Sequence, residues 1–223
     1  MKPFYEDKWV KIFHGDCREI LPSLDVKVDL VLTDFPYGND TDYGTYQDTQ
    51  GNLVALIGSV MPILKAERML ITCGVGNISL YPKPDWILAW VTPAGSGSSK
   101  WGFCCWQPIL AYGSDPYLQN GMGRRADVFI KTEVDHISNH PCSKPVDLWQ
   151  MVMQRGSVKA SDLILDPFLG SGTTCYCAKK LNRKSVGIEL SEKYCEVAAK
   201  RCMQEVMAFD LPTQHVDKQG DLL

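Results

Sequence analysis

The chain has 223 residues, of which 45% are hydrophobic, so it is long enough to bury the core of one full domain. Its net charge of −3 excludes a general attraction to a polyanion, so any contacts with nucleic acid must be local. Nine cysteines without paired Cys-x-x-Cys spacing argue against a zinc site or a disulfide framework. We see neither a signal peptide nor an apolar run of the roughly 18 residues that a membrane span needs. We therefore expect a cytoplasmic protein without a metal site.

The first half of the chain alternates between apolar runs and helical patterns. We expect strands at 9–13, 28–33, 68–73 and 86–91, and helices at 18–24 and 53–64. Residues 38–50 are rich in Gly, Asp, Tyr and Thr, which predicts a loop that is mobile rather than packed. Residues 93–100 predict a flexible surface loop.

The second half continues the alternation after a stretch, 113–139, that has little periodicity. We expect strands at 108–112, 163–165 and 185–188, and helices at 146–154, 175–184 (beginning near Gly172) and 192–209. Together these elements predict an α/β fold with a mainly parallel sheet and helices on both faces. We expect a single domain at 1–210 and a flexible tail at 211–223.

The stretch from Asp166 to Thr174 carries the clearest signal for a ligand site. It lies between a buried strand and a helix, so backbone N–H groups at the helix start can face an anionic group. Gly170 and Gly172 have no Cβ atom, which lets a ligand approach the main chain closely. The simpler interpretation is a tight connection. The turn lacks the Gly-Lys-Ser/Thr of a P-loop and the full Gly-x-Gly-x-x-Gly of a nicotinamide enzyme.

Glu189 strengthens the case for a nucleoside cofactor. It ends the strand that follows the glycine turn, where a carboxylate can accept hydrogen bonds from the two hydroxyls of a ribose. The alternative is a charge at a helix start, because Ser191 could cap the following helix. The turn and Glu189 together favour the cofactor.

Acidic residues end or follow several predicted strands, namely Asp16, Asp34, Asp166 and Glu189. Because the carboxyl ends of parallel strands share one edge, the Asp34-Phe35-Pro36-Tyr37 turn should lie beside the nucleoside site. Pro36 restrains Phe35 to extended geometry and so gives the Phe35 carbonyl a fixed direction. A carboxylate, an aimed carbonyl and an aromatic ring together suit a planar amine. The alternative is a plain turn in which Tyr37 serves for packing.

The order of these motifs resembles that of the S-adenosylmethionine-dependent DNA amino-methyltransferases, which methylate adenine N6 or cytosine N4. It is similar to their permuted β class, in which the catalytic motif precedes the cofactor motif. The resemblance spans residues 14–194 and rests on His14-Gly15-Asp16-Cys17, Thr33-Asp34-Phe35-Pro36-Tyr37-Gly38, His140-Pro141-Cys142-Ser143-Lys144-Pro145, Leu165 to Thr174, and Gly187-Ile188-Glu189-Leu190. It implies one Rossmann-like methyltransferase domain in a bacterial cell or a phage-infected host.

The resemblance also implies roles for individual residues, with S-adenosylmethionine as cofactor and DNA as partner. Glu189, next to Leu190, would bind the ribose hydroxyls, and Asp16 with Cys17 would lie against the adenine. Asp34, the Phe35 carbonyl, Pro36 and Tyr37 would hold the target base, and Asp34 would also border the cofactor. The methionine part would be held by Lys144, Asp166, Pro167, Phe168, Gly170, Ser171, Gly172, Thr173 and Thr174.

The sequence departs from the family's pattern at Phe35, where the family usually has proline. The carbonyl survives this change and Pro36 still restrains the turn, so we expect activity to persist. In the family, aspartate at the position of Asp34 goes mostly with adenine and serine with cytosine N4, so the resemblance favours adenine. We expect direct methyl transfer to a flipped base, or to a single strand, without a covalent enzyme intermediate.

Recognition of DNA sequence is expected from 113–139, the segment where this class usually carries its target-recognition part. Its short length predicts a short or relaxed recognition sequence, or help from a second subunit in a homodimer. Arg124 and Arg125 could contact phosphate or guanine, and Lys100 with the 38–50 loop could close over DNA. The alternative for the arginines is a solvated basic pair.

Three other functions stay open. The first is methylation of cytosine N4 or of RNA. The second is a weakly active relative that binds nucleic acid, which Phe35 and the acidic balance suggest. The third is a nicotinamide-dependent oxidoreductase.

Overall fold

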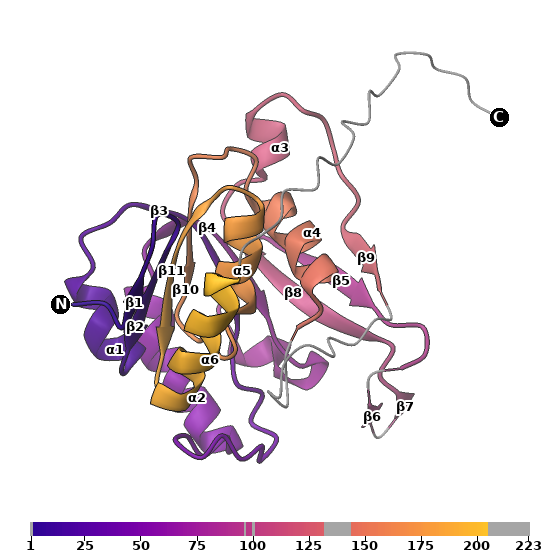
Figure 1. Ribbon diagram of the computed structural model, residues 1–223. Helices are drawn as coiled ribbons and strands as arrows, with labels where there is room; N and C mark the ends of the chain where they lie inside the picture. Colours follow the sequence, from indigo (N-terminus) through magenta and orange to yellow (C-terminus); the bar gives the residue numbers. More distant parts are fainter. Residues whose placement is uncertain (1, 96, 100, 132–143, 205–223) are drawn as a thin grey trace.

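The structure, a computed structural model, describes residues 2–95, 97–99, 101–131 and 144–204. In these residues one mixed sheet has the strand order β1-β2-β11-β10-β3-β4-β8-β5-β9 (Figure 1). The strands of the sheet are β1 (Tyr5–Glu6), β2 (Val10–His14), β3 (Val28–Asp34), β4 (Ala66–Thr72), β5 (Trp86–Val91), β8 (Trp106–Tyr112), β9 (Val128–Ile130), β10 (Leu163–Asp166) and β11 (Lys184–Glu189). A separate hairpin joins β6 (Ser98–Ser99) to β7 (Gly102–Phe103).

Helices connect most of the strands. The α-helices are α1 (Cys17–Ile20), α2 (Gln50–Val60), α3 (Pro116–Gln119), α4 (Val146–Gly156), α5 (Thr173–Lys180) and α6 (Glu192–Met203). There are also short 3₁₀ helices: η1 (Leu21–Ser23) follows α1, η2 (Met61–Ile63) follows α2, and η3 (Val75–Leu80) follows β4. Among the helices of the described ranges, none combines the length and the apolar character of a bilayer-spanning segment.

Five neighbouring strands, β2, β11, β10, β3 and β4, run parallel to one another. Their carboxyl ends therefore meet at one edge of the sheet, which we call the carboxyl edge. β8 runs antiparallel to both β4 and β5. The α/β class and the mainly parallel sheet are confirmed, with an antiparallel insertion at β8.

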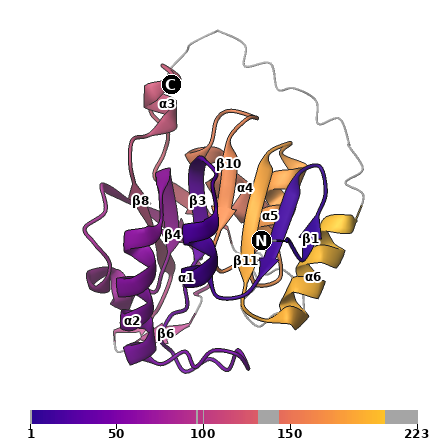
Figure 2. The ribbon, with the colours of Figure 1, turned by 90° about the vertical axis from the view of Figure 1, so that its left-hand side faces the viewer.

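The strands alternate their buried side chains between the two faces of the sheet. Leu30 and Leu32 face a core that α4 completes, whereas Val31 faces a core that α1 and α2 complete. A third group of buried residues, including Val10 and Ala198, joins α6 and α5 to β2. Helices thus cover both faces, and Figure 2 shows α2 and α6 on opposite sides of the sheet.

The structure corrects two of the expected segments. The helix expected at 175–184 ends at Lys180, because Asn182 adopts a left-handed conformation (φ 56°) and β11 already begins at Lys184. The 113–139 stretch contains α3 and the three-residue strand β9, which is too short to show periodicity in the sequence. The final helix begins as predicted, and its part beyond Gln204 lies outside the described residues, as does the tail.

The prediction of an unpacked 38–50 loop is wrong. Asp48 is 1% exposed, and its carboxylate accepts the backbone N–H of Gly38 at 2.8 Å. An isolated bridge also pairs Asp42 with Gln47. The loop is therefore anchored against the start of α2, where Thr49 caps the helix through the Asn52 N–H. In the 93–100 segment, expected as a flexible loop, Ser98 and Ser99 form β6.

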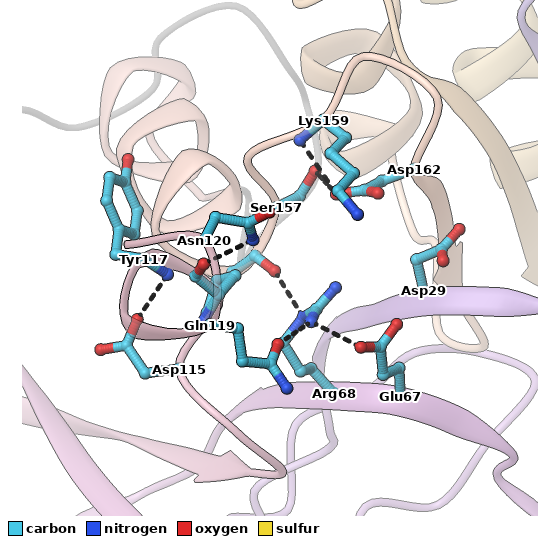
Figure 3. Close-up of polar contacts among 12 residues, drawn as sticks. Asp29, Glu67, Arg68, Asp115, Tyr117, Gln119, Asn120, Ser157, Lys159 and Asp162 are labelled. Atoms are coloured by element: carbon cyan, nitrogen blue, oxygen red, sulfur yellow. Dashed lines mark hydrogen bonds and ion pairs between the residues drawn. The ribbon is translucent and has the colours of Figure 1, made fainter. Parts of the chain in front are cut away.

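A buried arginine, Arg68, links the elements at the end of the sheet opposite the carboxyl edge (Figure 3). Arg68 on β4 donates from Nε to the Gly156 carbonyl at 3.1 Å and from Nη1 to Oε1 of Gln119 at 3.0 Å. Asp115 caps α3 through the Tyr117 N–H at 2.8 Å and pairs with Arg155 of α4 at 2.6 Å. β4, α3 and α4 are thus tied into one block far from the carboxyl edge.

Candidate active site

A cavity opens at the carboxyl edge, between the ends of β2, β11, β10 and β3. It brings together most of the residues that the sequence predicted for the site. These lining residues are Asp16, Cys17, Asp34, Phe35, Pro36, Lys144, Asp166, Pro167, Phe168, Gly170, Ser171, Thr173, Thr174, Glu189 and Leu190. Tyr37 and Gly172, also predicted for the site, do not line it.

Asp34, at the end of β3, is the centre of a polar cluster. Its Oδ1 accepts hydrogen bonds from the hydroxyls of Thr72 and of Tyr37, the latter at 3.0 Å. Its Oδ2 forms an ion pair with the Nζ of Lys144. The Asp34 and Lys144 side chains are 21% and 11% exposed, so this pair is largely shielded from water.

Tyr37 is folded back over the same cluster rather than into the cavity. Its hydroxyl lies 3.0 Å from Oε1 of Gln107 on β8, and its ring centroid lies 5.3 Å from the Lys144 ammonium. Its backbone carbonyl accepts a hydrogen bond from Nδ2 of Asn77 at 2.7 Å. Burial and the neighbouring Asp34 carboxylate raise the pKa of Tyr37 well above its usual value. The phenol is therefore a neutral donor that helps to orient Asp34.

Phe35 anchors the turn in the hydrophobic core. Its side chain is 1% exposed and makes edge-on ring contacts with Tyr81 at 5.6 Å and with Phe168 at 4.5 Å. Phe168 belongs to the glycine turn, so the Phe35 ring joins the two motifs of the site directly. This packing explains how an aromatic residue fits at this position.

Asp166, at the end of β10, holds the start of the glycine turn in place through hydrogen bonds. Its carboxylate accepts the Thr33 hydroxyl at 2.6 Å, the Phe168 N–H at 3.0 Å and the Thr174 hydroxyl. Thr174 in turn accepts the indole N–H of Trp149 at 2.7 Å. Burial raises the pKa of Asp166 to about 6.

Glu189, at the end of β11, lies where it could serve as a charge at the start of a helix and as a ligand for a ribose. Its Oε1 accepts the Ser191 N–H at 2.8 Å, at the start of α6, and its Oε2 accepts the Gly170 N–H at 2.7 Å. Burial raises the pKa of Glu189. An ionised carboxylate has about four acceptor positions, so these two bonds leave capacity on the side that lines the cavity. Glu189 can therefore hold the turn and accept two ligand hydroxyls as well.

The two glycines of the turn serve different purposes. Gly170 (φ 54°) directs its N–H to Glu189. Gly172 (φ 85°) lies against α6, and a Cβ atom there would come within 2.8 Å of the Cα of Ala198. Close approach of a ligand at Gly172 stays a prediction, and the structure gives this glycine a further reason: it allows close packing of α5 on α6.

Several residues of the site were missed by the sequence analysis. Arg18 forms an ion pair with Asp16 and lowers the pKa of that carboxyl. Arg201 of α6 is buried and donates to the hydroxyls of Thr173 at 3.0 Å and Ser171 at 3.4 Å. Other missed residues that line the cavity are Gly15, Tyr43, Thr45, Tyr46, Leu56, Trp149 and Tyr194. The tyrosines of the 38–50 loop were visible as a cluster, but nothing local indicated that the loop packs here.

The cysteine of the site is not arranged as a nucleophile. Cys17 is buried, and burial raises the pKa of its thiol to about 12. The thiol is therefore protonated near neutral pH, and the thiolate is the reactive form. Over the described parts of the chain, His, Cys, Asp and Glu side chains do not gather in groups of three that could hold a metal ion.

The basic residues predicted to contact DNA are not at this cavity. Arg124 and Arg125 line a second cavity with Trp86 and Tyr112, at the other edge of the sheet. Arg125 lies 4.9 Å from the ring centroid of Tyr117, a residue of α3. Lys100 lies outside the described residues.

The comparisons with known proteins all find DNA methyltransferases. Residues 100–200 match the family model described as DNA methylase, of the N6/N4 type. Over this part of its length the chain is similar to the N6/N4 DNA methylases. It is 27% identical to the type II methyltransferase M.HpaI of Haemophilus parainfluenzae over 82% of this chain and 70% of that protein. It is 26% identical to the type II methyltransferase M.ScaI of Streptomyces caespitosus, over 93% of this chain and 86% of that protein.

Solved structures of DNA methyltransferases have the same fold as this chain. The PvuII DNA methyltransferase, described as cytosine-N4-specific, superposes with a TM-score of 0.70 at 17% identity, covering 93% of this chain and 91% of that chain. The complex of M1.HpyAVI with S-adenosylmethionine superposes with a TM-score of 0.63 at 22% identity, covering 86% and 98% of the two chains. At these identities the likeness concerns the fold alone.

Proposed function

We propose that this protein is a DNA methyltransferase that transfers a methyl group from S-adenosylmethionine to the N6 amine of a flipped adenine. The observation that carries the proposal is the position of Asp34, whose carboxylate lines the same cavity as Glu189 and Asp166. A base-holding turn and a nucleoside-binding turn are thus neighbours at one edge of the sheet. The match to the DNA methylase family model supports the reaction, and the similar fold of a protein solved with S-adenosylmethionine supports the cofactor.

The cavity has the chemistry that S-adenosylmethionine requires. Glu189 would bind the two ribose hydroxyls with its remaining acceptor positions. Asp16 and Cys17 would lie against the adenine, and the segment from Asp166 to Thr174 would hold the methionine part, together with Lys144. When bound, the cofactor supplies an electrophilic sulfonium methyl group.

Asp34 and the Phe35 carbonyl would prepare the target amine. The amine of a heteroaromatic base is a poor nucleophile because its lone pair is delocalised into the ring. Two acceptors that take its N–H bonds favour a more tetrahedral nitrogen, whose lone pair is then available for direct transfer. Tyr37 and Thr72 hold the Asp34 carboxylate in position.

Lys144 must change its role when the site fills. In the structure its ammonium neutralises the Oδ2 atom that the target amine would use. We expect Lys144 to turn to the carboxylate of the cofactor's methionine part, which frees Oδ2 of Asp34 for the base. The binding of cofactor would therefore precede that of the base.

The test of this proposal is the Asp34→Ala variant. Methyl transfer to DNA should fall by about 100-fold or more, because an aligned acceptor at the reacting group is lost. S-adenosylmethionine binding, measured by calorimetry, should largely remain. Asp34→Asn keeps the shape and removes the charge, and Asp147→Ala removes an exposed carboxylate at the start of α4 as the matched control. Unchanged turnover in Asp34→Ala would refute the role.

Methylation of cytosine N4 is the second candidate, because the fold superposes well on an enzyme described as cytosine-N4-specific. The two products differ in mass after digestion to nucleosides. Mass spectrometry of DNA treated with the enzyme and labelled cofactor separates them. A parallel reaction on RNA detects methylation of RNA, and the absence of label from both nucleic acids would indicate an inactive binding protein.

We further propose that the enzyme forms a homodimer through an uncovered apolar face of the sheet. Ile87, Trp106, Val128 and Ile130 lie on one face of β5, β8 and β9 and are exposed, Ile130 to 64%. In the sheet that the described residues form, β9 is an edge strand, which can pair with a second copy. Light scattering should show a dimer that Ile130→Glu converts to monomers; a wild-type monomer would refute the interface.

The remaining expectations fit this function. The catalytic turn precedes the cofactor turn in the chain, which we interpret as the permuted order of the β class. We assign residues 1–210 to the methyltransferase domain and 113–139 to its target-recognition segment, with 211–223 as a tail. Because the proposed substrate is DNA of a bacterial cell or of a phage in its host, we expect the protein to act in the cytoplasm.

A further inference from the structure

The connection between β5 and β8 presents two large aromatic side chains to solvent. It contains the β6–β7 hairpin, whose strands pair Ser98 with Phe103. Trp101 in the turn is 99% exposed and Phe103 on β7 is 83% exposed. Full exposure of such side chains is costly in water, and exposed aromatics are typical of binding anchors.

The strands that carry the hairpin lie next to the proposed catalytic turn. β5 ends at Val91 and β8 begins at Trp106, and these two residues are paired in the sheet. The next residue, Gln107, lies 3.0 Å from the Tyr37 hydroxyl, which also bonds to Asp34. Figure 1 shows the hairpin and α3 at opposite ends of the sheet, so the hairpin projects from the carboxyl edge.

The backbone gives the hairpin a defined shape. The Cys104 N–H bonds to the Gly97 carbonyl at 2.9 Å, and the Thr92 N–H bonds to the Cys105 carbonyl at 2.8 Å. Gly102 (φ 121°) takes a conformation that L side chains rarely adopt, directly after Trp101. The two aromatic side chains are therefore presented by a paired structure.

The charge of this part of the chain suits a polyanion. Between Asp85 and Asp115 the sequence contains one charged residue, Lys100, and no carboxylate. This is unusual in a chain with 26 acidic residues and a net charge of −3. A phosphate backbone that approaches the carboxyl edge along the hairpin would meet no like charge from it.

We propose that Trp101 and Phe103 contact the DNA next to the flipped base, by stacking on the bases that base flipping leaves exposed. The proposal rests on the proposed function, because it takes DNA as the substrate. Removal of a base from the helix breaks the stacking of its neighbours, and an aromatic ring can replace that contact. Stacking is tolerant of sequence, because every base has a flat face. The hairpin would therefore add affinity and help to hold the base outside the helix.

The experiment compares Trp101→Ala, Phe103→Ala and the double variant with the wild type. Methyl transfer is measured on genomic DNA from a host without DNA methylases, and binding on fluorescent duplex and single-stranded oligonucleotides. Val26→Ala is the control, since Val26 is a 45% exposed apolar side chain that precedes the amino end of β3, away from the carboxyl edge and from the 113–139 segment. Trp101→Phe keeps an aromatic ring and should restore most of the function. Thermal stabilisation by S-adenosylmethionine reports whether the cofactor site is intact.

We expect the KM for DNA and the dissociation constant of the oligonucleotides to rise about tenfold in Trp101→Ala and further in the double variant. Cofactor binding should be unchanged, and Val26→Ala should behave as the wild type. A double variant with wild-type KM and affinity would overturn the proposal while leaving the proposed function intact. So would a double variant that only changes the oligomeric state, since the hairpin would then contact a second copy. A wild-type protein that methylates no DNA would end both proposals.

Discussion

Asp166 shows how one buried carboxylate can serve a site and weaken the fold at the same time. It holds the glycine turn through Thr174 and Phe168, and its pKa is raised to about 6 because it is buried. Its ordinary value is 3.8. The folded state therefore binds a proton more tightly than the unfolded state does. The contribution of Asp166 to stability is greatest below pH 4 and falls as the pH rises to about 6.

The Asp166→Asn variant tests this linkage. The amide cannot ionise, so the variant should gain stability relative to the wild type as the pH rises from about 4 to about 7. Two pH units correspond to about 3 kcal/mol at most, and lost hydrogen-bond geometry at Thr174 will subtract a constant amount. Urea unfolding of both proteins across this pH range measures the difference. A difference that does not vary with pH would show that the carboxyl titrates normally.

At the scale of elements, the contact of α5 with α6 depends on a glycine without a side chain. Gly172 precedes α5 in a left-handed conformation, and Ala198 of α6 lies against it. Arg201, one turn further along α6, bonds to Thr173 and Ser171 in the same turn. The packing of the two helices thus sets the shape of the proposed cofactor turn.

Gly172→Ala should destabilise the protein by about 2 kcal/mol or more, because the methyl group meets backbone at 2.8 Å and φ is unfavourable. S-adenosylmethionine binding should weaken with it. Gly58→Ala is the matched control: Gly58 lies on the exposed side of α2, and a Cβ atom there meets nothing within 4 Å. That change should stabilise the protein by about 0.5–1 kcal/mol. Thermal unfolding measures both, and an unaffected Gly172→Ala would contradict the packing described.

At the scale of the whole molecule, the proposed cofactor site joins both halves of the chain. Asp16 and Asp34 come from the first half, and Asp166 and Glu189 come from the second, and all line one cavity. Cofactor binding should therefore stabilise the fold as a unit rather than one part of it.

We expect S-adenosylmethionine to raise the melting temperature of the protein in a concentration-dependent way. At 100 times the dissociation constant, the gain in unfolding free energy is about 2.7 kcal/mol. NAD at the same concentration should give no shift, because the turn lacks the nicotinamide fingerprint. Stabilisation by NAD and not by S-adenosylmethionine would instead favour the oxidoreductase.

Much of the fold follows from local patterns. Apolar runs such as 28–33 and 163–165 are recognisable as buried strands, and the acidic residues that follow them indicate the carboxyl edge of the sheet. Short elements were missed, because three residues such as those of β9 carry too little periodicity. The packing of the 38–50 loop was not predicted because it depends on a hydrogen bond between Asp48 and the Gly38 N–H, ten residues earlier in the chain.

The sequence by itself determined the α/β class, the positions of the strand ends and the motifs that indicate the family. These are encoded locally, in hydrophobic spacing and in turn chemistry. Only the tertiary structure decided that β8 runs antiparallel and that Lys144 pairs with Asp34. It also decided that the hairpin with Trp101 lies at the carboxyl edge, whereas Arg124 lies at the opposite end of the sheet. Each of these depends on contacts between residues far apart in the chain, which local patterns do not specify.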